Sequence, residues 1–219
     1  MVEKQVHLPI SDSGQFAIDG HTLWVAAFDQ GILGVDTRDG QVVDRWNLDK
    51  ILGGGPGGQD SGRGVTVGDG SVWVSRDVGS GEVVRLDPAT GRVQRVFADL
   101  HGGYINLAYG DGAVWTADNA GMNRIDPRAN SVRHVDLPGV WNVAAGGGYG
   151  WASDDAKGVV YKVDQSGRPL DGVAGLPNLQ EPRSANCLAE GGRPFLVLLG
   201  GIGRLGHRGV AALSVTYSM

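Results

Sequence analysis

A short motif recurs along the chain, and it constrains the fold more than any other feature. The strings GDGSVWVSRD, from Gly68, and GDGAVWTADN, from Gly110, are nearly identical, and weaker copies begin at Asp19 and Gly146. Their tryptophans stand at positions 24, 73, 115 and 151, so the copies follow one another every 36 to 49 residues. A period near 40 residues indicates a repeat architecture.

Each copy divides into four short segments that are typical of β-strands. In the second copy these are GVTVG, SVWVS, EVVRLD and RVQRVFA, which are rich in valine and bounded by glycine or aspartate. Asp69-Gly70 favours a tight hairpin, and Pro88 and Gly91 favour a turn within DPATG. No segment shows the 3.6-residue period of a helix. The pattern therefore predicts an all-β fold, a β-propeller of four-stranded antiparallel blades.

We interpret the repeated tryptophans as packing residues between neighbouring blades rather than as rings that stack a ligand. A fifth, weaker copy follows from the spacing. Asn106 and Asn142 lie nine residues before their tryptophans, and Asn186 lies nine residues before Phe195.

A single β-propeller domain over residues 1–219 accounts for the whole sequence. The expected blades cover roughly residues 15–50, 64–100, 105–139, 141–175 and 185–217. Residues 3–9 resemble an orphan outer strand, yet VAALSVTY, from Val210, already resembles the outer strand of the last blade. Two arrangements stay open, a closed ring of five blades with one surplus strand or a segment of a ring of six or seven blades.

Charge and cysteine content exclude several classes of protein. The formal net charge is −5 and the basic residues are scattered, so we expect neither nucleic acid nor an anionic membrane surface as a partner. The lone Cys187 excludes an internal disulfide and a cysteine-cluster metal site. The opening residues lack the apolar core of a signal peptide, and no segment is typical of a membrane span. We therefore expect no membrane insertion and leave the compartment open.

Propeller topology places candidate binding residues at one end of the central channel. The loop before each first strand and the loop between second and third strands lie on one face, here called the mouth face, and the Asp-Gly hairpins lie on the opposite hairpin face. The candidate ligand-binding residues at the mouth are Arg63, Asp77, Asn106, Asp118, Asn142, Asp154 and Asn186. We expect Asp29, Tyr104, Trp141 and Arg183 beside them. Polar groups from several blades can reach one small molecule there, although such residues also satisfy loop backbone groups.

The stretch GVTVGDGSVWVSRDVGSGEVVRLDPATGRVQRV resembles the repeat of the YVTN-type bacterial β-propellers, which are related to NHL, quinoprotein-like and streptogramin B (virginiamycin B) lyase propellers. The resemblance covers residues 15–170 well and 186–217 poorly. It implies a propeller fold but no single function, because these propellers serve as binding modules, sensors and enzymes. For the lyases, the resemblance implies paired histidines and an acidic residue that hold a divalent metal at the mouth.

Only His101 stands in a loop that enters a first strand, whereas His134 falls on an expected outer strand. Because the lyase set needs a second histidine, we predict no catalytic residue and no cofactor. A divalent cation such as Ca²⁺ has a weak candidate site in the oxygens of Asp118, Asn119, Asp154 and Asp155. The sequence favours a noncatalytic propeller that binds or senses a small molecule or a protein at the mouth. The alternative is a metal-assisted lyase or hydrolase of the streptogramin B lyase type that acts at the same mouth.

Overall fold

The structure is a computed structural model, and it describes most of the chain. The described residues are 10, 13–27, 30–53, 63–101, 106–118, 120–154, 156–173, 185–190 and 193–198. In residues 171–173, 185–190 and 193–198 only the backbone is described. The expected strand at residues 3–9 and the segment VAALSVTY lie outside these ranges.

Four antiparallel sheets of four strands each follow one another along the chain, each with its strands in sequence order. The first contains β1 (Ser13–Asp19), β2 (Thr22–Ala27), β3 (Gly31–Asp36) and β4 (Val42–Trp46). The second contains β5 (Val65–Gly68), β6 (Ser71–Arg76), β7 (Glu82–Leu86) and β8 (Val93–Phe97). The third contains β9 (Asn106–Gly110), β10 (Ala113–Asp118), β11 (Gly121–Asp126) and β12 (Ser131–Val135). The fourth contains β13 (Asn142–Gly146), β14 (Tyr149–Asp154), β15 (Val159–Asp164) and β16 (Pro169–Val173).

A two-stranded sheet, β17 (Ala185–Glu190) and β18 (Arg193–Leu198), comes next. Its backbone register places Phe195 opposite Leu188, just as Trp151 lies opposite Ala144 in the fourth sheet. The fifth copy therefore has the same strand register as the others. A single short helix, α1 (Leu48–Leu52), follows β4 within the described residues, and the side chain of Asn47 caps it.

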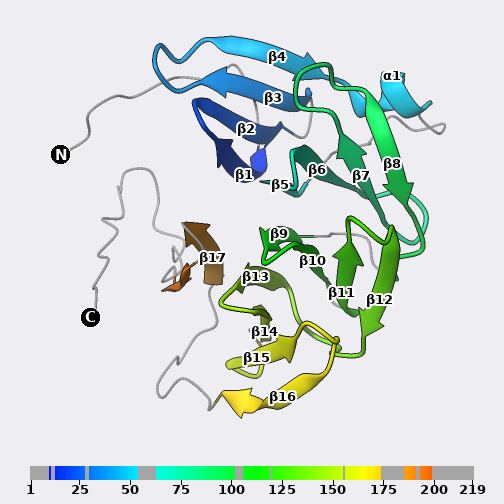
Figure 1. Cartoon of the computed structure of the whole chain (residues 1–219), viewed down its shortest axis with the longest axis vertical. Coiled ribbons are helices and arrows are strands. Elements are labelled where there is room, and N and C mark those ends of the chain that lie inside the picture. Colours follow the sequence, from blue (N-terminus) through cyan, green and yellow to red (C-terminus); the bar gives the residue numbers. More distant parts are fainter. Residues whose placement is uncertain are drawn as a thin grey trace, which may run out of the picture.

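The sheets are arranged around a common centre as the blades of a propeller (Figure 1). The first strand of each sheet is innermost, and these strands contact one another in chain order, β1 with β5, β5 with β9, β9 with β13 and β13 with β17. The fourth strands lie at the periphery (Figure 1). The chain is thus an all-β propeller, as the repeat pattern predicts. Nowhere in the described part of the chain is a helix long and apolar enough to cross a membrane.

The turn conformations confirm the predicted division of each repeat into strands and turns. Asp69 and Gly70 have φ angles of 52° and 66°, and Asp111 and Gly112 have 51° and 77°, so both hairpins use two left-handed residues. In the DPATG turn, the Asp87 side chain accepts a hydrogen bond from the Ala89 backbone N–H at 3.0 Å. Such a bond from an aspartate to the backbone two residues on stabilises a turn locally.

The repeated tryptophans occupy one register position, the third residue of the second strand. Trp24, Trp73 and Trp115 are 2%, 0% and 0% exposed, and Trp151 is half-buried. Each buried ring packs between its own blade and the next. Trp115, for example, belongs to a cluster that includes Val143 of the fourth blade. The prediction that these tryptophans pack between blades is confirmed for the first three.

Candidate functional site

The predicted binding residues with described side chains lie at the ends of strands or in loops on the mouth face. They are Arg63, Asp77, Asn106, Asp118, Asn142 and Asp154. For Asn186 the structure describes only the backbone, and Asp29, Tyr104, Asn119, Asp155 and Arg183 lie outside the described residues. The geometry separates the described residues into an amide register on the innermost strands and a charged register at the ends of the second strands.

The amide register connects blades. Asn106 begins β9, and its Nδ2 donates to the backbone oxygen of Trp141, which precedes the fourth blade, at 2.5 Å. Asn142 begins β13, and its Nδ2 lies 3.4 Å from Ser153 Oγ. Asn106 therefore makes the loop-tying contact that is the alternative to ligand binding. That these amides also bind a ligand stays a prediction.

Gln15 occupies the same register in the first blade, and the sequence reasoning missed it. It lies nine residues before Trp24, so the spacing that singled out Asn106 was sufficient to find it. Its Oε1 accepts from the Leu107 backbone N–H at 2.8 Å, and its Nε2 donates to the Leu107 oxygen at 3.2 Å. The Gln15 backbone N–H donates to the Arg63 oxygen at 2.9 Å. One residue of the first blade thus contacts the second and the third.

The charged register is the last residue of the second strand, held by Arg76, Asp118 and Asp154. Asp77 stands one residue later and is half-buried, so the predicted aspartates do not share a single register. Arg76 forms an ion pair with Glu82 at 2.9 Å. Asp154 forms one with Lys157 at 2.6 Å. Two of these three buried charges are therefore neutralised by their own neighbours.

The two buried aspartates differ in their ionisation. Burial alone would raise the pKa of Asp154, but the hydrogen bonds and the charge of Lys157 outweigh burial and lower it. Burial raises the pKa of Asp118, and backbone hydrogen bonds and two nearby histidines only partly oppose this. Asp118 Oδ1 accepts from the Ala120 N–H at 2.7 Å. Asp118 Oδ2 is buried without a hydrogen-bond partner among the residues that the structure describes.

The histidines near Asp118 are His101 and His134, whose ring centroids lie 4.9 Å apart. The sequence reasoning separated them, because His134 was expected on an outer strand and only His101 at the mouth. His134 does lie on the outer strand β12, but the loop that enters the third blade brings His101 against it. No spacing in the sequence signals this pairing.

Trp141, in the loop that enters the fourth blade, is the exposed member of the six tryptophans, with 40% of its surface accessible. Its backbone is held on both sides, because its oxygen accepts from Asn106 Nδ2 and its N–H donates to the Ser153 oxygen at 3.0 Å. The ring is therefore presented on a fixed backbone, as the rigid aromatic anchors of binding surfaces are.

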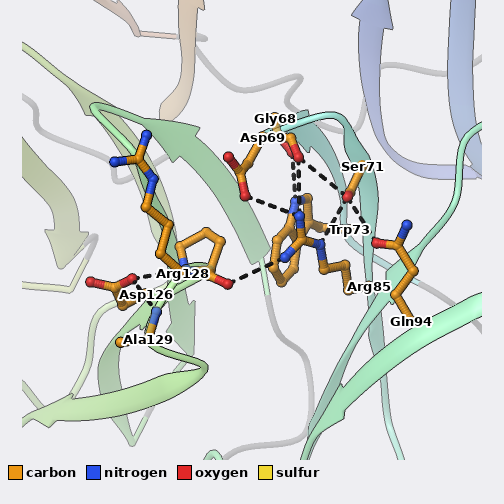
Figure 2. A network of polar contacts seen from close by, with 10 residues as sticks. Gly68, Asp69, Ser71, Trp73, Arg85, Gln94, Asp126, Arg128 and Ala129 are labelled. Atoms are coloured by element: carbon orange, nitrogen blue, oxygen red, sulfur yellow. Dashed lines mark hydrogen bonds and ion pairs between the residues drawn. The ribbon is translucent and has the colours of Figure 1, made fainter.

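The hairpin face carries a different set of contacts (Figure 2). The Arg85 guanidinium lies 5.1 Å from the Trp73 ring centroid, bonds Asp69 Oδ2 at 3.0 Å, and reaches the Pro127 oxygen of the next blade at 3.2 Å. Arg124 lies opposite Trp115 in the third blade, and Lys162 lies opposite Trp151 in the fourth. This repeated cation supports blade packing. The sequence reasoning missed it, although the strings VVRLD, NRIDP and YKVDQ display it.

Within the described ranges, no group of three histidine, cysteine, aspartate or glutamate side chains is placed to hold a metal ion. A shallow cavity of about 490 Å³ lies at the edge of the first blade, lined by Gln30, Arg45, Trp46, Asn47, Lys50 and Ile51. None of the predicted binding residues lines this cavity.

Comparisons with known proteins identify the architecture. No family model matches the sequence, and no curated protein matches it. Virginiamycin B lyase from Staphylococcus aureus is similar in structure, with a TM-score of 0.65 and 18% identity over 84% of this chain. A nidogen/laminin complex contains a similar chain, with a TM-score of 0.59 and 13% identity over 75% of this chain. A WD40 domain from Neurospora crassa gives a TM-score of 0.56 and 16% identity over 73%.

These likenesses show the β-propeller fold. The chain spans 63% of the length of the lyase, 64% of the chain in the nidogen/laminin complex and 52% of the chain with the WD40 domain.

Proposed function

We propose that this chain is a noncatalytic binding or sensing module whose ligand site lies on the mouth face of the propeller. The ligand, a small molecule or a segment of a protein, docks on the mouth face beside Trp141. We expect the predicted mouth residues to contribute polar contacts to this ligand; they are Arg63, Asp77, Asn106, Asp118, Asn142, Asp154 and Asn186. One likeness by structure is to a chain in a protein–protein complex, nidogen/laminin, so the fold is compatible with such a role.

The observation that carries this proposal is the exposed ring of Trp141 on a fixed backbone. Trp24, Trp73 and Trp115 are at most 2% exposed, whereas Trp141 is 40% exposed. Keeping a large apolar ring in water forgoes the stabilisation of burial, about 1.5–3 kcal/mol for a large apolar side chain. The two hydrogen bonds to the Trp141 backbone remove part of the ordering cost that a ligand would otherwise meet. A preorganised aromatic ring beside polar groups is the common composition of a binding surface.

The likeness to virginiamycin B lyase concerns fold at 18% identity, so its activity is not transferred to this chain. His101 and His134 beside Asp118 have the residue types of the lyase set, but within the described ranges no three such side chains are placed to hold a metal ion, so the noncatalytic function stays the proposal.

The proposal is tested by a ligand screen that reports on each tryptophan separately. The chain has six tryptophans, so six indole N–H signals are expected in an ¹⁵N-correlated NMR spectrum, and a Trp141→Phe variant assigns one of them. A fragment library containing amines, carboxylates, sugars, nucleotides and short peptides is added in pools. We expect the hits to shift the Trp141 signal and to lose affinity in a Trp141→Ala variant.

Val132→Ala is the matched control, because Val132 is 41% exposed but lies on the peripheral strand β12. The fragment hits should bind the Val132→Ala variant as tightly as they bind the unmodified chain. Hits that leave the Trp141 signal unmoved and bind Trp141→Ala as well as the unmodified chain would refute the proposed site.

A further inference from the structure

Asp118 has a buried carboxyl group, one oxygen of which has no hydrogen-bond partner among the described residues. The side chain is 1% exposed at the end of β10, and Oδ1 is engaged by the Ala120 N–H at 2.7 Å. Oδ2 is also buried but has no hydrogen-bond partner among the described residues. An unpaired buried carboxylate oxygen costs free energy of folding. A ligand that bonds Oδ2 would remove this cost.

The hydrogen bonds of Asn123 determine which nitrogen of His134 is free. Asn123 Nδ2 donates to the Leu100 oxygen at 2.9 Å and to Thr116 Oγ1 at 3.0 Å. Because a backbone carbonyl only accepts, this fixes the orientation of the amide, and Asn123 Oδ1 must be an acceptor. His134 Nδ1 lies 3.1 Å from this oxygen and therefore carries the proton. In neutral His134 the Nε2 atom is consequently an acceptor that faces away from Asn123.

The His134 ring lies against the backbone of the strand that pairs with Asp118. The Cε1 atom of His134, which lies between the two ring nitrogens, is 3.0 Å from the position that a Cβ on Gly121 would take. Gly121 is the cross-strand partner of Asp118. His134 and His101 are both exposed, and their paired rings lie near the buried carboxylate.

In the neighbouring blades, the charged residue at this position has an ion-pair partner. At the same register Arg76 is paired with Glu82, and Asp154 is paired with Lys157. Asp118 thus differs from its two charged equivalents, since no lysine or arginine side chain is bonded to it among the described contacts. A buried carboxylate oxygen without a partner is an acceptor for a donor group, and a positively charged donor gains most from a desolvated carboxylate.

We propose that Asp118, with His134 beside it, is an anchor for an organic cation, an ammonium or guanidinium group that bonds Asp118 Oδ2 and His134 Nε2. The exposed His101 ring forms the rim of this anchor. The inference deepens the proposed function and rests on it in one respect, that the ligand approaches the mouth face. The group arrives on a small amine or on a lysine or arginine of a protein partner.

The test uses n-butylammonium and n-butylguanidinium as probes, with n-butanol and butyrate as size-matched neutral and anionic probes. Binding is measured at about pH 8 through the NMR signals of the histidine Cε1–H groups. We expect both cations, and neither control compound, to shift the His101 and His134 signals. Asp118→Asn, checked for folding by its melting curve, should weaken cation binding by about tenfold or more.

Asp39→Asn is the matched control variant, since Asp39 Oδ1 also accepts from the backbone two residues on, Gln41 N–H at 2.9 Å, but stands exposed on the hairpin face. Its cation affinity should stay within about twofold of the unmodified chain. His134→Gln is a second variant and should also weaken the cation probes. Equal cation binding by Asp118→Asn, or binding of n-butanol as strong as that of n-butylammonium, would overturn the proposal. So would binding of Zn²⁺ to the two histidines without any response to the cations.

The two proposals fail separately. If Trp141→Ala abolishes binding of fragment hits while Asp118→Asn leaves the cation probes unaffected, the mouth surface stands and the cation anchor is refuted. If Asp118→Asn loses the cations while Trp141→Ala retains every hit, the anchor stands and the Trp141 surface is refuted.

Discussion

Replacing Trp115 with alanine is expected to remove about 3–5 kcal/mol from the free energy of unfolding. The ring is fully buried, at 0% exposure, in the cluster between the third and fourth blades. A Cβ placed on Gly150 of the fourth blade would come within 2.5 Å of Trp115 Cε3, so the ring lies directly against that backbone. Because strand backbone cannot collapse into the space of the lost ring, the cavity should persist and the cost should approach the upper end of the range.

Phenylalanine substitutions separate the ring from its polar nitrogen. Trp73 Nε1 donates to the Gly68 oxygen at 3.0 Å, whereas Trp115 Nε1 is buried without a partner among the described residues. Trp73→Phe loses a hydrogen bond, but Trp115→Phe removes an unsatisfied donor. We therefore expect Trp73→Phe to be the more destabilising of the two by about 1–3 kcal/mol.

Urea unfolding followed by far-ultraviolet circular dichroism measures these differences without depending on tryptophan fluorescence. Trp141→Ala is the control for loss of an exposed indole and should cost less than about 1 kcal/mol. If Trp115→Ala costs no more than Trp141→Ala, the interpretation of the repeated tryptophans as inter-blade packing residues is wrong. If Trp115→Phe lowers the free energy of unfolding as much as Trp73→Phe does, the hydrogen bond of Trp73 Nε1 does not contribute the stability assigned to it.

Three further outcomes are expected. The raised pKa of Asp118 means that the folded chain binds this proton more tightly than the unfolded chain, so stability is lost as pH rises from about 4 through the folded pKa. Asp118→Asn should therefore become more stable relative to the unmodified chain over that rise. A constant difference between their urea midpoints would contradict this. Gly68→Ala should cost about 1–3 kcal/mol in the same assay, because its Cβ would lie 2.1 Å from the Tyr109 ring, and a neutral effect would exclude this contact. The Ser166 hydroxyl is the chief cause that lowers the pKa of the Asp164 carboxyl to about 2, so this group contributes stability above pH 4 that is lost as pH falls toward 2. Asp164→Asn should reduce the loss of stability between pH 4 and pH 2. An unchanged loss would exclude the contribution.

The repeat determined most of what could be predicted. Strand register in a blade depends on local turns and alternation, so Asp69-Gly70 and Trp73 were sufficient to place the second blade. The same register places Asn106 and Asn142 at the starts of β9 and β13, as expected.

Contacts between segments that occupy different positions within the repeat could not be predicted from its spacing. His101 and His134 lie in different parts of the third blade, and nothing in the spacing shows that the loop before β9 meets β12. Closure of the ring is a second case. Phe16 and Ile18 are each 60% exposed on β1, on the side opposite to Ala17, which packs toward the second blade. Whether a last blade covers that side depends on the number of repeats and not on the pattern within one. Five blades or a larger ring therefore stays a prediction.

The Gln15 side chain has a consequence for the order of assembly. In a repeat array whose units contact only adjacent units, each unit completes its bonds as soon as the next one folds. Gln15 must instead wait for Leu107, which lies 92 residues further along the chain. At a synthesis rate of about 5–20 residues per second, that segment leaves the ribosome some 5–20 seconds later. The amide is hydrated until then and bonds only to an assembled third blade. If the contact is also absent from the folding transition state, it slows the opening of the finished propeller without accelerating its formation.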